Sequence, residues 1–203
     1  MSLAAPSPIV LASASTARHR LLEAAGVAVS SDPAAIDEAH VKNEFRREGR
    51  CAGRCAAALA EAKALHVAAR HPGALVIGAD QLLDCDGTWL DKPRDPDQAR
   101  QHLLLLRDRT HVLHAAVAVA HDGRVVWSMV EAVQLHMRPF SVRFLDDYIA
   151  AMGERVCAMV GGYELEGLGA QLFDRVGGDY FAVLGLPLLP LLDFLRGAGA
   201  LAS

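Results

Sequence analysis

The sequence predicts an α/β protein with a mixed, partly antiparallel sheet flanked by helices. Near the start of the chain, patterns typical of a strand, a helix and a second strand follow one another at 9–12, 16–25 and 27–30. Further along, Asp86-Gly87 and Asp122-Gly123 join apolar runs, and both pairs tolerate the positive φ of a tight type I′ turn. A strand–helix–strand order followed by antiparallel hairpins is typical of a mixed sheet covered by helices. We expect two lobes around a central cleft.

The remaining elements are predicted from composition, turn residues and helix caps. The alanine-rich stretch from Cys51 to about Arg70 predicts a long helix, which Pro72-Gly73 ends. The continuous apolar run 74–79 predicts a strand buried on both faces, and the first hairpin follows it directly. Asp95-Pro96-Asp97-Gln98 combines an N-cap with a first-turn proline and predicts a helix to about residue 107. The other expected elements are an irregular acidic segment around Asp37 and Glu38, antiparallel strands at 110–121 and 125–138, a helix from Ser141 to about 152, a glycine-rich loop at 161–169 and a last core or interface helix from Pro187.

Composition and charge limit the classes of protein to consider. The 203 residues, 52% of them hydrophobic, suffice for a complete core, and the absence of a repeat or linker predicts one domain over 1–203. A net charge of −4 provides no global attraction for nucleic acid or an anionic membrane, so neither is expected as a partner. The four cysteines lack the spacing of a zinc site and the density of a secreted disulfide framework, and the N-terminus lacks a signal-peptide pattern. These features predict a cytoplasmic protein.

The turn between the first strand and the first helix, Ser13-Ala14-Ser15-Thr16-Ala17-Arg18, has the chemistry of an anion site. Ser15 is a natural N-cap, and the free N–H groups of a first helical turn attract phosphate or carboxylate. The helix dipole opposes Arg18 in this position, which favours a nearby anion. The alternative is an ordinary capped helix with a solvated arginine. Further cations in the first quarter of the chain, which fit either a solvated helix face or a binding patch, are Arg20, Lys42, Arg46, Arg47, Arg50 and Arg54.

Asp80 is the main candidate for acid–base or metal chemistry. It follows a buried apolar run, and Gly78 leaves room for close approach, so the carboxylate is suited to bind a metal or to accept a proton from water. The alternative is that Asp80 only begins the hairpin. Lys92 could present its ammonium group to a phosphate, or it could be an ordinary solvated lysine. The same two interpretations apply to Glu38 and Lys63.

Other chemistry-bearing residues give weaker signals. His111, His114 and His136 have neither helical i, i+4 pairing nor a neighbouring cysteine pair, so we do not expect a zinc site there. The loop at 161–169 lacks the glycine spacing of a dinucleotide fingerprint, and no GxSxG elbow supports a serine nucleophile.

Several of these segments occur in a distinctive order. They are Leu11 to Arg18, Ile36-Asp37-Glu38, Leu59 to Ala64 around Lys63, Gly78-Ala79-Asp80, Asp91-Lys92-Pro93, Glu166-Gly167 and Val183 to Pro187. In this order, and over nearly the whole chain, they resemble the Maf family of nucleoside triphosphate pyrophosphatases. The resemblance implies an α/β fold with a central cleft, a cytoplasmic homodimer, and hydrolysis of a nucleotide to its monophosphate and pyrophosphate with a divalent cation, Mg²⁺ or Mn²⁺.

Carried over to this chain, the family pattern implies that Asp80 activates water and that Asp80 and Glu38 hold the metal. The residues expected to bind the substrate are Ser13, Ser15, Arg18, Lys63, Lys92 and Glu166. The chemistry of these residues agrees with the implied roles. Cations at a helix N-terminus neutralise phosphate charge, and a carboxylate beside a metal prepares a water molecule for attack.

The chain departs from the family pattern at three positions. Thr16 replaces the usual proline, and a first helical turn tolerates this replacement. Gln81 replaces the usual threonine, and this replacement affects the expected geometry of the metal site. Glu166 replaces a common glutamine. A carboxylate only accepts hydrogen bonds and so matches the adjacent donors of guanine, above all cationic 7-methylguanine, whereas an amide matches uracil or thymine. The sequence around Glu166 also resembles the family branch that acts on 7-methyl-GTP.

Three alternatives stay open at this point. A dTTP/UTP pyrophosphatase would use the same machinery with another base. A nucleotide-binding regulator of cell division is a second alternative, since the family was first associated with septum formation. An enzyme of the inosine triphosphate pyrophosphatase type shares the reaction, but the motifs fit it less well.

Overall fold

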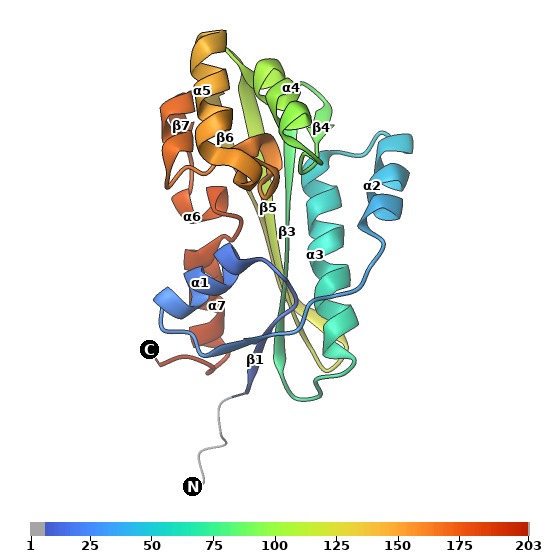
Figure 1. The fold of residues 1–203 in the computed structure, drawn as a ribbon. Helices are drawn as coiled ribbons and strands as arrows, with labels where there is room; N and C mark the ends of the chain where they lie inside the picture. The colour runs from blue at the N-terminus through green and yellow to red at the C-terminus, as the bar shows by residue number, and fades with distance from the viewer. Residues whose placement is uncertain (1–6, 203) are drawn as a thin grey trace, which may run out of the picture.

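The computed structural model describes residues 7–202, and Figure 1 shows its ribbon. The signal-peptide prediction concerns the N-terminus and falls in part outside these residues. The strands are β1 (Ile9–Leu11), β2 (Val29–Ser31), β3 (Leu75–Cys85), β4 (Thr88–Leu90), β5 (Thr110–His121), β6 (Arg124–Met137) and β7 (Phe173–Gly177). The helices are α1 (Thr16–Ala24), α2 (Glu38–Arg47), α3 (Ala52–Ala68), α4 (Pro96–Leu106), α5 (Val142–Met152), α6 (Tyr180–Val183) and α7 (Leu188–Gly197), with 3₁₀ turns η1 (Gly153–Cys157), η2 (Val160–Gly162) and η3 (Leu168–Leu172).

One mixed sheet joins the seven strands of the described residues in the order β2-β1-β3-β5-β6-β7, with β4 paired to β3. Strand β1 is parallel to β2 and β3, whereas the other pairs are antiparallel. The predicted α/β class and mixed sheet are therefore confirmed. The two lobes around a cleft stay a prediction, as does the single domain over 1–203.

The tight turns of the sheet form at the two Asp-Gly pairs. Asp86 and Gly87 have φ values of 52° and 83°, and Asp122 and Gly123 have φ values of 47° and 75°. Both residues of each pair thus have the positive φ that a type I′ turn requires. The hairpins β3–β4 and β5–β6 are the two that the sequence predicts.

Helices cover both faces of the sheet (Figure 1). Helix α3 packs on one face, where Ala60 is buried with Val76 of β3. Helices α1 and α7 cover the other face, where Leu22 and Leu191 are buried with Ile77. Because side chains alternate along a strand, the consecutive residues Val76 and Ile77 serve opposite layers.

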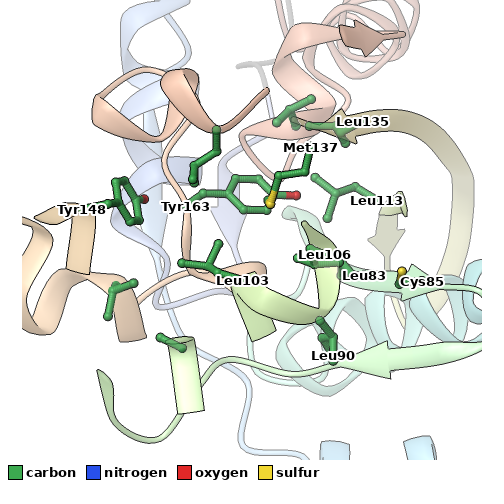
Figure 2. Packing of buried hydrophobic residues seen from close by; sticks show 14 of the residues in the cluster. Leu83, Cys85, Leu90, Leu103, Leu106, Leu113, Leu135, Met137, Tyr148 and Tyr163 are labelled. Atoms are coloured by element: carbon green, nitrogen blue, oxygen red, sulfur yellow. The ribbon is translucent and has the colours of Figure 1, made fainter. Parts of the chain in front are cut away.

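A third apolar cluster lies between helices α4 and α5 and the ends of the long strands β3, β5 and β6. Figure 2 shows its packing. Two phenols lie within it, and burial raises the pKa of both Tyr148 and Tyr163. The Tyr148 hydroxyl donates to the Gly162 carbonyl at 3.0 Å, and the Tyr163 hydroxyl lies 2.8 Å from Nε2 of His111. These bonds satisfy the polar ends of the rings and tether the start of the glycine-rich segment.

The structure differs from the expected elements around α2 and at the end of the sheet. Helix α2 replaces the irregular acidic segment: Asp37 caps it by accepting a hydrogen bond from the His40 N–H at 2.9 Å. No residue of α2 is fully buried, and its apolar stripe is limited to Val41 and Phe45, which are half-buried against the cluster that contains Ala60. The short, mostly exposed strand β7 lacks such a signal too, and part of the glycine-rich 161–169 forms 3₁₀ turns.

Strand β3 does not end at Ala79, as the apolar run predicts, but continues to Cys85. It pairs with β5 over residues 76–84, so backbone hydrogen bonds carry the strand through polar Asp80. Asp80 therefore lies in the middle of a strand and neither ends it nor begins the hairpin.

The last helix, α7, begins after Pro187 as predicted and buries Leu188, Leu191 and Leu195 in the core. Within residues 7–202, none of the helices has the length and apolar character needed to cross a bilayer.

Candidate active site

Asp80 lies beside a gap in the pairing of β3. Strand β1 pairs with β3 over 75–77 and β4 pairs with it over 83–85, both on the edge opposite β5. Among the described residues, no strand fills that edge between them (Figure 1). The gap begins where parallel β1 ends, at the register Leu11–Ile77. The carboxyl ends of parallel strands are the usual ligand-binding edge of α/β sheets.

Gly78 allows α3 to lie directly against β3. A Cβ at this position would lie 2.6 Å from the backbone nitrogen of Ala64 and would collide with the carbonyl oxygen of Ala60. A side chain there would force the helix and the strand apart. Asp80 is two residues beyond Gly78 and so faces the same side of the sheet. The close contact therefore brings Lys63, next to Ala64 on α3, to the carboxylate of Asp80.

Lys63 bridges two carboxylates. Its Nζ lies 2.6 Å from Oδ1 of Asp80 and 2.8 Å from Oε1 of Glu38. Lys63 and Asp80 are 8% and 5% exposed, whereas Glu38 occupies the first position of α2, where the helix dipole favours its charge. Burial would raise the pKa of Glu38, but the hydrogen bond and charge of Lys63, with the charges of Lys42 and Arg18, lower this pKa below its usual value. Glu38 is thus ionised at neutral pH.

The second oxygen of Asp80 is suited to a ligand. Oδ2 is buried without a hydrogen-bond partner among the described residues, a situation that usually costs about 1–3 kcal/mol. Two neighbouring carboxylates with such an oxygen fit Mg²⁺ or Mn²⁺, since Mg²⁺ is commonly held by one or two carboxylates, water and substrate phosphates. The described residues form no group of three or more His, Cys, Asp or Glu side chains for a metal. Two carboxylates would leave coordination positions on such a cation for water and substrate phosphates.

The turn before α1 is held together by its own side chains. Ser13 Oγ accepts hydrogen bonds from the Ser15 N–H and from Nη1 of Arg18, both at 3.2 Å. Ser15 caps α1 by accepting from the Arg18 N–H at 3.4 Å, as predicted. Arg18 also donates to the carbonyls of Ala79 at 3.0 Å and Gly185 at 2.8 Å. Arg18 is therefore not a solvated arginine, and it ties α1 to β3 and to the segment before α7.

The charges of two cations on other elements, Arg18 and Lys92, interact with the acidic pair. Burial lowers the pKa of Arg18, against the raising effect of Asp80 and then Glu38. Burial lowers the pKa of Lys92, and so do the positive charges of Arg18 and Lys63. The negative charges of Glu38 and Asp80 act in the opposite direction. The structure thus groups six of the predicted site residues, namely Ser13, Ser15, Arg18, Glu38, Lys63 and Asp80. Lys92 is exposed, and its place in the site stays a prediction.

Glu166, like Lys92, has no contact among the described residues that joins it to this group. It is exposed in the segment between η2 and η3, and no hydrogen bond or ion pair within residues 7–202 connects it to Asp80, Lys63 or Arg18. Its place in the site stays a prediction.

Gln81 and Gly185 have roles that the sequence did not reveal. The amide nitrogen of Gln81 donates to the carbonyls of Ala182 at 2.9 Å and Val183 at 3.1 Å, so it anchors α6. Gly185 has a φ of 99° and presents its carbonyl to Arg18. In the sequence, Gly185 stands between two leucines just before Pro187. A single glycine in an apolar segment is a signal for a residue with positive φ, since a positive φ favours glycine.

The fold and these side chains together define a class of site, in which a helix N-terminus and several cations face two carboxylates at a sheet edge. The chain belongs to the Maf family: the family model described as Maf-like protein matches residues 8–198. The family predicted from the ordered motifs is thereby confirmed.

Named relatives cover nearly the whole chain. A nucleoside triphosphate pyrophosphatase of Paramagnetospirillum magneticum is 57% identical over 192 residues, which are 95% of this chain and 99% of that protein. A protein of the same name from Granulibacter bethesdensis is 51% identical over 95% of this chain and 98% of its own length. A 7-methyl-GTP pyrophosphatase of Rhizobium johnstonii is 44% identical over 95% of this chain and 97% of its own length.

Proposed function

We propose that this chain is a nucleoside triphosphate pyrophosphatase that hydrolyses its substrate to the monophosphate and pyrophosphate. The observation that carries the proposal is the Asp80–Lys63–Glu38 bridge beside the N-terminus of α1. The names of the relatives support the same reaction. Removal of modified nucleotides before they enter nucleic acids is the cellular task that we assign to it.

Asp80 is the proposed proton acceptor. Lys63 holds Oδ1, which leaves the buried Oδ2 to take a proton from a water molecule. The water oxygen then forms a bond to the α-phosphorus, the bond from that phosphorus to the oxygen shared with the β-phosphate breaks, and pyrophosphate leaves. Glu38 and Asp80 would hold the divalent cation. When bound, this cation supplies positive charge to the triphosphate and to the developing oxyanion.

The triphosphate is assigned to the turn before α1 and the cations around it. The first-turn N–H groups of α1 point out of the helix and attract anions. Arg18 uses Nε and Nη1 for its bonds to Gly185, Ala79 and Ser13, and among the described residues no hydrogen bond engages Nη2. Lys92 contributes a further ammonium group. These charges would offset those of the phosphates in the ground state and the transition state.

The base is assigned to the segment that carries Glu166. Its carboxylate accepts hydrogen bonds only, which favours guanine and above all 7-methylguanine. The Rhizobium relative named 7-methyl-GTP pyrophosphatase supports this choice of substrate. UTP or dTTP is the alternative substrate.

Assembly and location complete the proposal. We infer a homodimer in the cytoplasm, and light scattering coupled to size-exclusion chromatography would test the dimer directly. A monomeric mass at micromolar concentration would contradict it.

The decisive experiment measures pyrophosphate release from 7-methyl-GTP, GTP, UTP, dTTP, CTP and ITP with Mg²⁺ or Mn²⁺. Turnover of one or two of these, lost after addition of EDTA and in Asp80→Asn, is the expected result. Asp146→Asn is the matched control, because Asp146 is an exposed acid on α5. The absence of turnover with every nucleotide would overturn the proposal, and a preference for ITP would favour the inosine triphosphate pyrophosphatase alternative.

A further inference from the structure

The acidic pair continues outward from Glu38 as a series of alternating charges. Oε2 of Glu38 lies 3.9 Å from Nζ of Lys42, and the same Nζ lies 2.8 Å from Oδ1 of Asp91. Oδ2 of Asp91 lies 3.2 Å from Nη2 of Arg46. The complete series, from the buried strand to the surface, is Asp80, Lys63, Glu38, Lys42, Asp91 and Arg46.

Lys42 is not a solvated member of the basic patch on α2. Its side chain is 15% exposed, whereas that of Arg47 is 73% exposed. Burial would lower the pKa of Lys42, but the hydrogen bond and charge of Asp91 raise this pKa above its usual value. Arg46, the other partner of Asp91, lies over the Trp89 ring at 5.3 Å from its centroid. Asp91 therefore binds two neighbouring turns of α2 to the end of β4.

The position of Asp91 in the chain links two groups of the proposed site. Lys92 follows it directly, and Lys42 lies one helical turn after Glu38. Helix α2 packs on the core through the half-buried Val41 and Phe45, and its ion pairs with Lys63 and Asp91 add to the contacts that position it. Lys42 is closer to Asp91 than to Glu38, at 2.8 Å against 3.9 Å. Without Asp91, Lys42 would be free to pair closely with Glu38 and to neutralise its charge.

We propose that Asp91 is a positioning residue of the triphosphate and cation site. By binding Lys42 and Arg46, it keeps Glu38 available to a divalent cation and fixes the backbone directly before Lys92. This inference rests on the proposed function for its substrate. It gives a functional role to Asp91, which would otherwise be interpreted as a member of a surface ion pair.

Kinetics of Asp91→Asn test the inference, because the change removes the charge and keeps the shape. The KM for the triphosphate and the Mg²⁺ concentration for half-maximal activity should each rise about fivefold, as expected for the loss of one favourable charge interaction. Asp91→Glu should restore both to within about twofold. A purely structural role would lower the melting temperature and leave both constants unchanged, and that result would overturn the inference.

Asp146→Asn is the matched control. The Asp146–Arg100 pair has a separation of 2.8 Å and joins α4 to α5, and the Asp146 side chain is 54% exposed against 49% for Asp91. Its removal breaks an equivalent surface bridge between two elements, and it should leave KM and the Mg²⁺ dependence unchanged. Equal effects of the two variants would contradict a specific role for Asp91.

Calorimetric titration with inorganic tripolyphosphate and Mg²⁺ separates this inference from the proposed function. The Kd should rise about fivefold in Asp91→Asn. Lys42→Met combined with Asp91→Asn should bind no more weakly than Asp91→Asn alone, since the replaced Lys42 can no longer neutralise Glu38. If Asp91→Asn binds tripolyphosphate more weakly but the wild type hydrolyses no nucleotide, the proposed function is contradicted and this inference is not. Wild-type hydrolysis with an unchanged Kd would remove this inference alone, and a wild-type protein that binds no tripolyphosphate would overturn both.

Discussion

The ammonium nitrogen of Lys63 lies 2.6 Å from Oδ1 of Asp80, and Oδ2 of the same carboxylate has no hydrogen-bond partner within residues 7–202. A cation on α3 thus orients a carboxylate on β3, and the two side chains come from the close contact between α3 and β3 at Gly78. The same lysine reaches Glu38 on α2 at 2.8 Å. The geometry of the proposed site therefore depends on how α3 is seated.

Replacement of Asp80 by asparagine should reduce kcat by about 10²- to 10⁴-fold, the usual contribution of a general base. An amide keeps the shape of the side chain but accepts no proton from water. Steady-state kinetics with the best nucleotide, together with a calorimetric Kd for that nucleotide, would measure the two effects separately. Near-normal kcat in the variant would exclude Asp80 as the base.

Gly78→Ala should destabilise the protein by about 3 kcal/mol and lower the activity, since the new methyl group must push α3 away from β3. Gly197→Ala is the matched control. A Cβ at Gly197, at the end of α7, would meet nothing within 4 Å, so this change should be neutral or stabilising by up to about 1 kcal/mol. Urea unfolding of both variants would measure the difference, and equal stabilities would contradict the packing argument.

Glu166→Gln should shift the ratio of kcat/KM values from 7-methyl-GTP or GTP toward UTP or dTTP, by about tenfold. Glu166 is exposed, so its replacement should leave the melting temperature unchanged. A competition assay with two nucleotides in one reaction measures the ratio directly. If the ratio stays the same, Glu166 does not read the base.

His111 should make the protein less stable in mild acid. Burial lowers the pKa of His111 to about 4, against about 6.5 in an unfolded chain. Between these values the unfolded state binds more protons, so this contribution to stability is complete above pH 6.5 and is lost as pH falls toward 4. From pH 7 to pH 5 the loss should be about 2 kcal/mol.

The variant His111→Gln tests this dependence, because glutamine retains a partner for the Tyr163 hydroxyl and does not titrate. Its free energy of unfolding, measured by urea at pH 7 and pH 5, should fall less than that of the wild type by about 2 kcal/mol. The same pH dependence in both proteins would show that His111 does not titrate as a buried base.

Local signals predicted much of the fold because they belong to neighbouring residues. The Asp-Gly turns and the caps Ser15, Asp95 and Ser141 lie where the sequence placed them. Helix α2 escaped prediction because only a short apolar stripe, Val41 and Phe45, packs on the core. The length of β3 escaped prediction because pairing with β5 carries the strand through its polar centre.

For the candidate site, the sequence alone determined which residue types are present and, through the order of its motifs, the family. It could not determine that Arg18 holds Ala79 and Gly185, that Gln81 anchors α6, or that Asp91 binds Lys42. These contacts join residues that are far apart in the chain. Only the assembled sheet, with α1, α2 and α6 seated around it, brings them within bonding distance. The tertiary structure therefore decided the geometry, because the free energy of such contacts becomes available only once the sheet and its helices have assembled.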